Sequence, residues 1–245
     1  MGMDWHRSSL NEESINAATT PYWRVRVINE TASTQSDLAN FINSGKAQSG
    51  EVFIAEYQSA GRGRLDRSFI APPKSSLLFS LYLENEIDLT WLPLIAGIAI
   101  CNVISETKLK WPNDIQIDDK KCGGILAEKV ANGVIIGIGL NVYQVPDELP
   151  IPEATSLSQH GFSGNRDQLL IAILQELGKL IRSWPGNKKQ IKDRYLSLSS
   201  TIGKSVEVTL PNGEIVSGIA KSITDSGELV IGEQQINVGD IRHLR

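Results

Sequence analysis

The stretch Gln58–Phe69 (QSAGRGRLDRSF) gathers two glycines and three arginines within a few residues, directly after an apolar run. The backbone can take positive φ and pass close to a ligand at residues that lack a Cβ, which here are Gly61 and Gly63. Planar, permanently charged groups that match the geometry of phosphates and carboxylates are supplied by Arg62, Arg64 and Arg67. A solvated surface turn can have the same composition. The loop is therefore a candidate anion-binding site that needs support from elsewhere in the chain.

The stretch Lys108–Val130 (KLKWPNDIQIDDKKCGGILAEKV) is a second candidate. Pro112 biases the residue before it toward an extended conformation, and Asn113 and Asp114 are turn formers. We therefore expect a strand to end here and to expose these polar side chains. Lys121 follows a predicted hairpin turn and precedes a Gly-Gly pair, which suits the close approach of a ligand or of another strand. The charge run DDKK by itself is typical of a solvated turn.

We expect β-strands to position both the arginine loop and the stretch Lys108–Val130. Alternating or β-branched apolar residues predict strands at residues 22–28 and 51–58, an antiparallel neighbour of the latter at residues 76–83, and a hairpin over residues 127–142. Two glycines, Gly137 and Gly139, lie inside the second strand of this hairpin. Because glycine weakens a strand, we expect either a ligand lying over the sheet at this point or a β-bulge.

Helices are predicted where apolar residues recur at helical spacing. The expected helices run from a cap at Ser33 or Thr34 to Gly45, over residues 89–105, over residues 165–184 and again from residue 188. From residue 203 onward, short alternating runs separated by turn residues predict a small all-β barrel. Residues 1–21 are polar and aperiodic, and we expect a poorly ordered lead there.

The composition limits the class of protein. The chain has 245 residues with 41% hydrophobic residues and a net charge of −4, which suits one medium domain plus a small one. An acidic balance argues against a protein that coats nucleic acid, so the arginine loop indicates a local site for a small anion. The two cysteines supply neither a disulfide framework nor a zinc site, and a cytoplasmic location is expected. No apolar run reaches the roughly 20 residues of a membrane span.

Five pieces follow one another along the chain: Ser33-Thr34, GRGRLDRSF, KWPNDI, KCGGILAE and GIGLN. In this order and at these spacings the set resembles the catalytic domain of biotin protein ligases. The resemblance implies an α+β fold, with a mixed β-sheet flanked by helices as in class II aminoacyl-tRNA synthetases, and a small C-terminal SH3-like β-barrel. It implies three parts: a lead at 1–21, a catalytic biotin- and ATP-binding domain at 22–200, and an SH3-like domain at 201–245. It also implies a monofunctional type without an N-terminal DNA-binding domain.

The resemblance implies an ATP-dependent, Mg²⁺-requiring ligase. Such an enzyme activates biotin to biotinyl-5′-AMP and transfers the biotinyl group to a lysine of the biotin carboxyl carrier protein of acetyl-CoA carboxylase. It implies no nucleic-acid or membrane partner, and it allows a homodimer paired through the catalytic sheet. Three alternatives stay open: a lipoate or octanoate ligase of the same fold, against which the GRGR and KWPND pieces argue, a ligand-responsive DNA-binding regulator, and a nucleotide-binding module without catalysis.

The resemblance also assigns site residues. It implies catalytic roles for Lys121, Arg62, Arg64 and Asp114, the last as a Mg²⁺ ligand or as a group that orients the acceptor lysine. It implies a biotin pocket formed by Ser33, Thr34, Gln35, Gln58, Gly61, Arg62, Arg64, Lys121, Gly124 and Gly137. The implied nucleotide site comprises Arg62, Arg64, Arg67, Phe69, Lys110, Trp111, Asn113, Lys121 and Asn141.

The chain departs from the family pattern at three places. Gln35 stands where the family usually has Asn or Asp, Leu65-Asp66 replaces a more usual Arg-Gly, and Phe69 replaces a common Trp. An aspartate inside the loop lowers its net positive charge. These departures therefore bear on Arg67 more than on Arg62 and Arg64.

Overall fold

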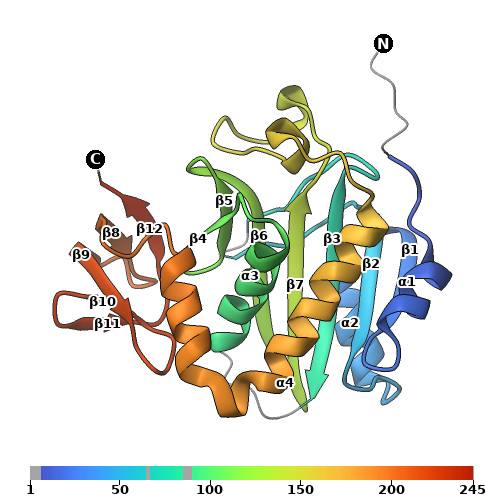
Figure 1. Ribbon diagram of the computed structural model, residues 1–245, viewed down its shortest axis with the longest axis horizontal. Coiled ribbons are helices and arrows are strands. Elements are labelled where there is room, and N and C mark those ends of the chain that lie inside the picture. The colour runs from blue at the N-terminus through green and yellow to red at the C-terminus, as the bar shows by residue number, and fades with distance from the viewer. Residues whose placement is uncertain (1–6, 65–66, 85–89, 245) are drawn as a thin grey trace.

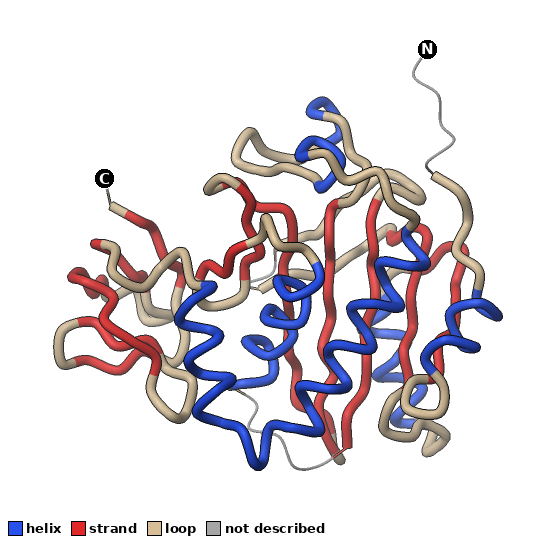
Figure 2. The backbone as a smooth tube through the Cα atoms, viewed as in Figure 1, coloured by secondary structure: helices blue, strands red, loops and turns tan. Residues whose placement is uncertain are grey.

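The computed structural model describes residues 7–64, 67–84 and 90–244, and shows helices packed on a large sheet with a smaller sheet beside it (Figure 1, Figure 2). The large sheet has seven strands in the order β1-β2-β3-β7-β6-β5-β4. Its strands are β1 (Arg24–Thr31), β2 (Glu51–Gln58), β3 (Ser76–Glu84), β4 (Lys108–Lys110), β5 (Asp114–Ile117), β6 (Lys120–Val130) and β7 (Gly133–Asn141).

Connection length explains the direction of the strands. β1 and β2 pair in parallel, because helix α2 (Thr34–Asn43) carries the chain back between them. The other neighbours pair antiparallel, and only two residues separate β6 from β7. The predicted strands and the hairpin are therefore present.

The two faces of the large sheet are covered differently. Helices α3 (Trp91–Val103) and α4 (Arg166–Leu198) lie on one face, in front of the sheet in Figure 1, and α2 lies behind it. The main core sits on the α3/α4 side, where α3 is buried along most of its length between the sheet and α4. A smaller cluster around Leu38 and Phe53 fills part of the α2 side. The rest of the α2 side of the sheet is not filled by this cluster and can accommodate a functional site.

Helix α4 consists of two helical arms that meet at a kink, as the sequence predicts (Figure 1). It runs on past Pro185, and the non-helical residue is Asn187, with φ −129° and ψ 26°. Proline removes one backbone donor and disturbs the preceding turn, and the chain kinks here between two helical arms. The break falls two residues after the proline.

The expectation of a poorly ordered lead is wrong for part of it. Residues 12–19 form helix α1 (Glu12–Thr19), whose Ile15 is fully buried. The amide of Asn16 brackets the backbone of Val25 on the edge strand β1, donating to its carbonyl at 2.7 Å and accepting from its N–H at 2.8 Å. Two buried side chains, Ile15 and Thr19, and these edge contacts order a helix that apolar periodicity does not reveal.

The C-terminal strands form a second sheet of five antiparallel strands in the order β11-β10-β9-β8-β12. They are β8 (Ser205–Thr209), β9 (Ile215–Ile223), β10 (Leu229–Ile231), β11 (Gln234–Ile236) and β12 (Asp240–His243). Within the described residues the edge strands β11 and β12 do not pair, so the sheet is not the closed barrel that we expected. Three-residue strands such as β10 and β11 offer few hydrogen bonds with which to close it.

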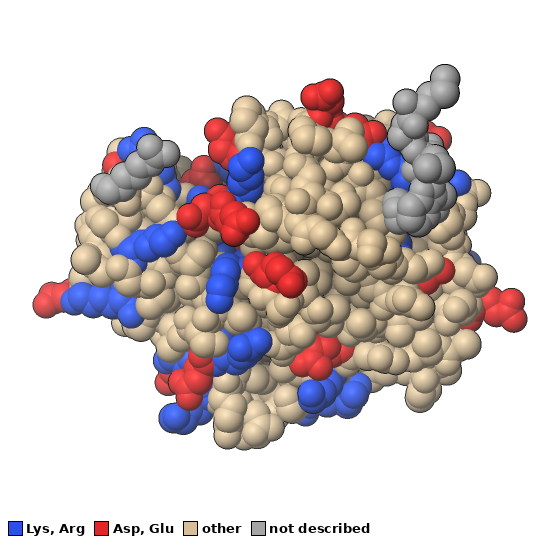
Figure 3. All heavy atoms as spheres, turned by 45° about the horizontal axis from the view of Figure 1, so that its top comes forward, with Lys and Arg blue, Asp and Glu red and all other residues tan. Residues whose placement is uncertain are grey.

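The charges on the surface are mixed. On the face shown in Figure 3, basic and acidic side chains lie beside one another and do not gather by sign. Among the described residues, none of the helices combines the length and the apolar character needed to cross a membrane.

Candidate active site

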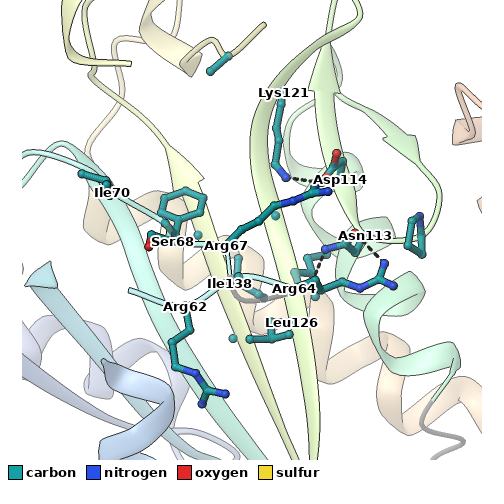
Figure 4. A pocket seen from close by; sticks show the side chains of 18 of the residues that line it. Arg62, Arg64, Arg67, Ser68, Ile70, Asn113, Asp114, Lys121, Leu126 and Ile138 are labelled. Carbon is teal, nitrogen blue, oxygen red and sulfur yellow. Dashed lines mark hydrogen bonds and ion pairs between the residues drawn. The ribbon is translucent and has the colours of Figure 1, made fainter. Parts of the chain in front are cut away.

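A pocket of about 580 Å³ opens on the α2 side of the large sheet, and both sheets contribute to it (Figure 4). The floor comes from β3, β6 and β7, one wall from the arginine loop, and the opposite wall from the segment 110–121. The C-terminal sheet adds the start of β12 at Gly239–Ile241. Segments more than 200 residues apart in the sequence therefore meet at one cavity.

The structure brings most of the expected site residues together. Those that line the pocket are Ser33, Thr34, Gln35, Gln58, Arg62, Arg64, Arg67, Phe69, Lys110, Trp111, Asn113, Asp114, Lys121, Gly124 and Gly137. Two expected residues do not line it. The buried Asn141 donates to the carbonyl of Thr155 at 3.0 Å and accepts from Gln144 at 3.0 Å, so its amide is used inside the fold. Gly61 lies under the chain at Phe69, where a Cβ would come within 2.4 Å of a carbonyl oxygen.

The arginine loop folds back on itself as a short hairpin. Gly63 donates its N–H to the carbonyl of Arg67 at 2.7 Å, and Phe69 donates to the carbonyl of Gly61 at 2.9 Å. Arg62 and Ser68 form a β-bridge. The absence of a Cβ at Gly61 is thus required by its own backbone neighbour in this conformation. The Leu65-Asp66 departure lies outside the described residues.

Each arginine of the loop has a different partner. Arg62 binds the carboxylate of Glu128 on β6 at 2.6 Å, and Arg64 donates to Asn113 Oδ1 at 3.2 Å. Arg67 pairs with Asp240 of the C-terminal sheet. Arg62 points away from Lys121 and Asp114, whereas the side chains of Arg64 and Arg67 extend toward that end of the pocket (Figure 4).

The electrostatic surroundings separate two of these arginines. Burial lowers the pKa of Arg64, while Asp240 and Asp114 act against that shift. The hydrogen bond from Arg67 to Asp240 raises the pKa of Arg67. Arg64 is therefore the more desolvated cation, and a desolvated cation interacts more strongly with an anion that enters the pocket. Arg67 is the more exposed of the two and is already neutralised by a partner.

Lys121 is positioned by both its backbone and its side chain. Its N–H donates to the carbonyl of Glu153 at 2.8 Å, and its own carbonyl accepts from Thr155 at 2.8 Å. The ammonium group forms an ion pair with Asp114, which lies at the start of the neighbouring strand β5. A Cβ at Gly124 would lie 3.5 Å from the Lys121 Nζ, so the glycine keeps space open beside the amine.

The far end of the pocket is polar but uncharged. Gln58 Oε1 accepts from the backbone N–H of Thr34 at 2.7 Å, at the start of α2, where Ser33 is the cap. The hydroxyls of Thr34 and Ser80 lie 2.8 Å apart. These short polar side chains can hydrogen-bond a small polar ring. The pocket therefore joins a neutral hydrogen-bonding end to a cationic end.

The strand glycines are explained by side chains of this chain. A Cβ at Gly137 would lie 2.4 Å from Gln35 Oε1, and one at Gly139 would lie 2.7 Å from the ring of Phe69. The ladder between β3 and β7 is continuous through both positions, so the bulge explanation is wrong. In this structure Gln35 and Phe69 lie directly over the sheet where a ligand was expected.

Two pocket-lining residues, and one residue that contacts the pocket lining, were missed by sequence reasoning. Ser80 interrupts an otherwise apolar buried strand, which is a signal that could have been used. Glu128 lies on β6 and faces the pocket side through its contacts with Arg62 and Gln35. Asp240 carries no local signal, because its proximity to the arginine loop depends on how the C-terminal sheet packs.

The described residues contain no cluster of three or more His, Cys, Asp or Glu side chains able to hold a metal ion. Mg²⁺ is commonly bound through one or two carboxylates and the phosphates of a nucleotide, with water completing its shell. The single carboxylate of Asp114 beside Lys121 fits that arrangement. It does not fit a metal site built from protein ligands alone.

Comparison with known proteins agrees with this geometry. Residues 27–142 match the Biotin/lipoate A/B protein ligase family, and residues 201–244 match the Biotin protein ligase C terminal domain. The chain is 38% identical to the biotin–[acetyl-CoA-carboxylase] ligase of Mycobacterium tuberculosis, over 97% of this chain and 95% of that protein. It is 35% identical to the bifunctional ligase/repressor BirA of Bacillus subtilis, over 84% of this chain and 67% of that protein.

The same likeness is seen in solved structures. The biotin protein ligase from Aquifex aeolicus in complex with biotin and ATP superposes with a TM-score of 0.80 and 26% identity, covering 90% of this chain and 99% of the other. The synthetase from Helicobacter pylori with bound biotinylated ATP, at 24% identity and a TM-score of 0.67, shares the fold.

Proposed function

The chain belongs to the biotin protein ligase family, and we propose on that premise how its pocket performs the reaction. It is an ATP-dependent ligase that activates biotin to biotinyl-5′-AMP and passes the biotinyl group to a lysine of the biotin carboxyl carrier protein of acetyl-CoA carboxylase. One observation carries this function: a single cavity joins the neutral end at Thr34 and Gln58 to the cationic end at Arg64 and Lys121. Biotin has a neutral ureido ring at one end and a carboxylate at the other.

In the first step the carboxylate of biotin attacks the α-phosphate of ATP, forming the mixed anhydride and releasing pyrophosphate. Two anions must approach each other, so fixed cations around the reacting atoms lower the barrier. Lys121 and Arg64 supply those cations, with Arg62 and Arg67 on the same loop. Mg²⁺, held by Asp114 and the phosphates, would neutralise negative charge on the nucleotide.

Lys121 must change partner for this role. Its ammonium group is paired with Asp114 in the present conformation, and the phosphate would replace that carboxylate. Asp114 is then released to bind Mg²⁺ or to orient the acceptor lysine. Because Lys121 and Asp114 would act at neighbouring positions, one wall of the pocket carries both residues.

In the second step the amine of the acceptor lysine attacks the carbonyl carbon of the anhydride, and AMP leaves with the bonding electron pair. No nucleophile of this chain takes part. The chain's contribution is to hold the two reactants in attack geometry, which can lower the barrier by roughly 7–11 kcal/mol. The ring of Phe69 and the aromatic Trp111 border the nucleotide side and limit access of water.

The remaining assignments follow from the same premise. The catalytic domain ends near Ser200 and the C-terminal domain begins at residue 201, where the chain passes from α4 into the five-stranded sheet. A cytoplasmic location suits an enzyme that consumes ATP and has two buried, unpaired cysteines. A homodimer paired through the large sheet would have to avoid Val25 on β1, whose edge Asn16 occupies.

Biotin-dependent exchange of pyrophosphate into ATP tests this function directly. The chain should catalyse exchange with biotin and should label a purified biotin carboxyl carrier protein when ATP is supplied. Exchange that requires lipoate or octanoate in place of biotin would overturn the assignment. If exchange proceeds but transfer to the carrier protein fails, only the assignment of the acceptor would be wrong.

A further inference from the structure

Glu128, on β6, contacts both the arginine loop and the start of α2, through Arg62 and Gln35. Arg62 donates to Glu128 Oε1 at 2.6 Å and to Oε2 at 3.2 Å. The amide nitrogen of Gln35 donates to Oε2 at 3.0 Å. An ionised carboxylate accepts hydrogen bonds and has none to give, and a bidentate arginine suits the ionised form. Glu128 therefore fixes the amide of Gln35 with its nitrogen toward β6 and its oxygen toward β3.

The position of the Gln35 oxygen then determines the direction in which the Ser80 hydroxyl donates its hydrogen. Ser80 is 1% exposed, and its Oγ lies 3.1 Å from Gln35 Oε1 and 2.8 Å from the hydroxyl of Thr34. A hydroxyl has a single hydrogen to donate. If Ser80 gives its hydrogen to Gln35, the short contact with Thr34 is satisfied only when Thr34 donates to Ser80.

The other assignments of the two hydroxyl hydrogens leave a hydrogen bond in this network unmade. Thr34 Oγ1 also lies 3.0 Å from Gln58 Oε1, which accepts the Thr34 backbone N–H at 2.7 Å and has a second lone pair. Donation from Thr34 to Gln58 would leave either two hydroxyl oxygens 2.8 Å apart with no hydrogen between them, or the Gln35 oxygen without its donor. Unsatisfied buried acceptors are unfavourable. The chain of donors therefore runs from Thr34 through Ser80 to Gln35, and it ends at Glu128.

We propose that Glu128 is a positioning residue that sets the direction of this hydrogen-bond chain, so that Thr34 meets the ligand ring as an acceptor. The proposal rests on the proposed function, because a ring N–H of the biotin ureido group is the donor that Thr34 would accept. If the amide of Gln35 turned over, its nitrogen would donate to Ser80 and Ser80 to Thr34, so one lone pair of the Thr34 oxygen would be occupied and its hydrogen would turn toward Gln58. The ligand N–H would then compete with Ser80 for the Thr34 oxygen.

Glu128→Gln tests the proposal, because glutamine has nearly the same shape but can present either a donor or an acceptor to Gln35. The Michaelis constant for biotin in the pyrophosphate exchange assay should rise about tenfold, which is the effect of losing roughly one hydrogen bond. The kcat at saturating biotin and the Michaelis constant for ATP should stay within a factor of two. Glu84→Gln, at the exposed end of β3, is the matched control.

Ser80→Ala separates this chain from the ion pair with Arg62. The variant interrupts the chain while leaving both Arg62–Glu128 contacts in place, so it should raise the Michaelis constant for biotin to a similar degree. Because both substitutions act on one chain, the Ser80→Ala/Glu128→Gln double variant should be no worse than about tenfold, instead of the hundredfold expected from independent sites. Should the Glu128 variant fail to fold, the Ser80 variant still decides the question.

A ligand-side comparison identifies the atom involved. Biotin methylated on the ureido nitrogen that faces Thr34 has no hydrogen to donate there, so binding of this analogue should be weak and equally weak in the unaltered chain and in Glu128→Gln. An unchanged Michaelis constant for biotin in either single variant, additive effects in the double variant, or an equal loss for biotin and for both methylated analogues would overturn the proposal. Absence of biotin-dependent exchange in the unaltered chain would overturn the proposed function itself.

Discussion

The ammonium group of Lys121 on β6 is paired with the carboxylate of Asp114, at the start of the neighbouring strand β5, in the wall of the pocket. Both side chains are partly exposed, so the pair is a modest contribution to stability. In the proposed function the pair matters because a phosphate would replace Asp114 before Lys121 acts on that phosphate.

Replacing Lys121 by Ala should lower kcat/KM for biotin-dependent exchange at least about 100-fold, since a cation placed at developing negative charge is worth about 3–4 kcal/mol. The exposed neighbour Lys120→Ala is the control and should leave exchange unchanged. Circular dichroism and thermal unfolding should be the same for the two variants. Exchange retained by Lys121→Ala would remove this lysine from the reaction.

The close contact between Gly137 and Gln35 predicts that a second substitution, at Gln35, restores part of the biotin binding lost in Gly137→Ala. A Cβ at residue 137 would overlap Gln35 Oε1, so Gly137→Ala should weaken biotin binding about tenfold or more and lower stability by about 1–3 kcal/mol. Shortening Gln35 to Asn withdraws the oxygen from that space. Calorimetric titration of biotin should show tighter binding by Gln35→Asn/Gly137→Ala than by Gly137→Ala alone. Without such a recovery, the glycine is required for another reason.

The ion pair between Arg67 and Asp240 predicts that the C-terminal sheet restrains the arginine loop. Both groups are more than half exposed, so the pair is worth at most about 1 kcal/mol. Asp240→Asn should therefore speed the release of biotinyl-5′-AMP by a factor of about 2–5, measured by stopped-flow dilution of the preformed complex. Asp225→Asn, on the same sheet but away from the loop, is the control. Equal release rates would show that the pair does not restrain the loop.

Acid should destabilise the chain partly through His243. Burial, followed by the nearby Lys110 and Lys204, lowers the pKa of His243 from 6.5 to about 4. The unfolded chain therefore takes up this proton first, so the contribution is complete above pH 6.5 and is lost as the pH falls from 6.5 toward 4. Because the ring is partly exposed, we expect about 1–2 kcal/mol over this window, after discounting for solvent screening.

His243→Gln checks this prediction by comparison of urea unfolding at several pH values. The free energy of unfolding of the unaltered chain should fall more steeply between pH 6.5 and 4 than that of the variant. His243 Nε2 lies 3.1 Å from Thr201 Oγ1, and that oxygen accepts the backbone N–H of Trp111 at 3.1 Å. The wall of the pocket at Trp111 should therefore lose a support in acid. Parallel curves would rule out His243 as the titrating group.

Much of the fold could be predicted because the signals are local. Strands β2 and β3, helix α3 and the β6–β7 hairpin follow from apolar periodicity and turn residues, which act over a few neighbouring residues. Helix α1 was missed because its order depends on burial of Ile15 and on the edge of β1. The openness of the C-terminal sheet depends on which strands pair, and sequence pattern does not specify pairing.

The sequence by itself determined the chemical groups of the site and their order along the chain, because a lysine beside two glycines and arginines among glycines are properties of residue type and spacing. Which of these groups lie in contact depends on the tertiary structure alone. Gln35 lies over Gly137, Glu128 joins Gln35 to Arg62, and Asp240 reaches Arg67. These contacts join residues about 70 to 170 positions apart, and only the register of the large sheet and the packing of the smaller one against it bring them within hydrogen-bonding distance.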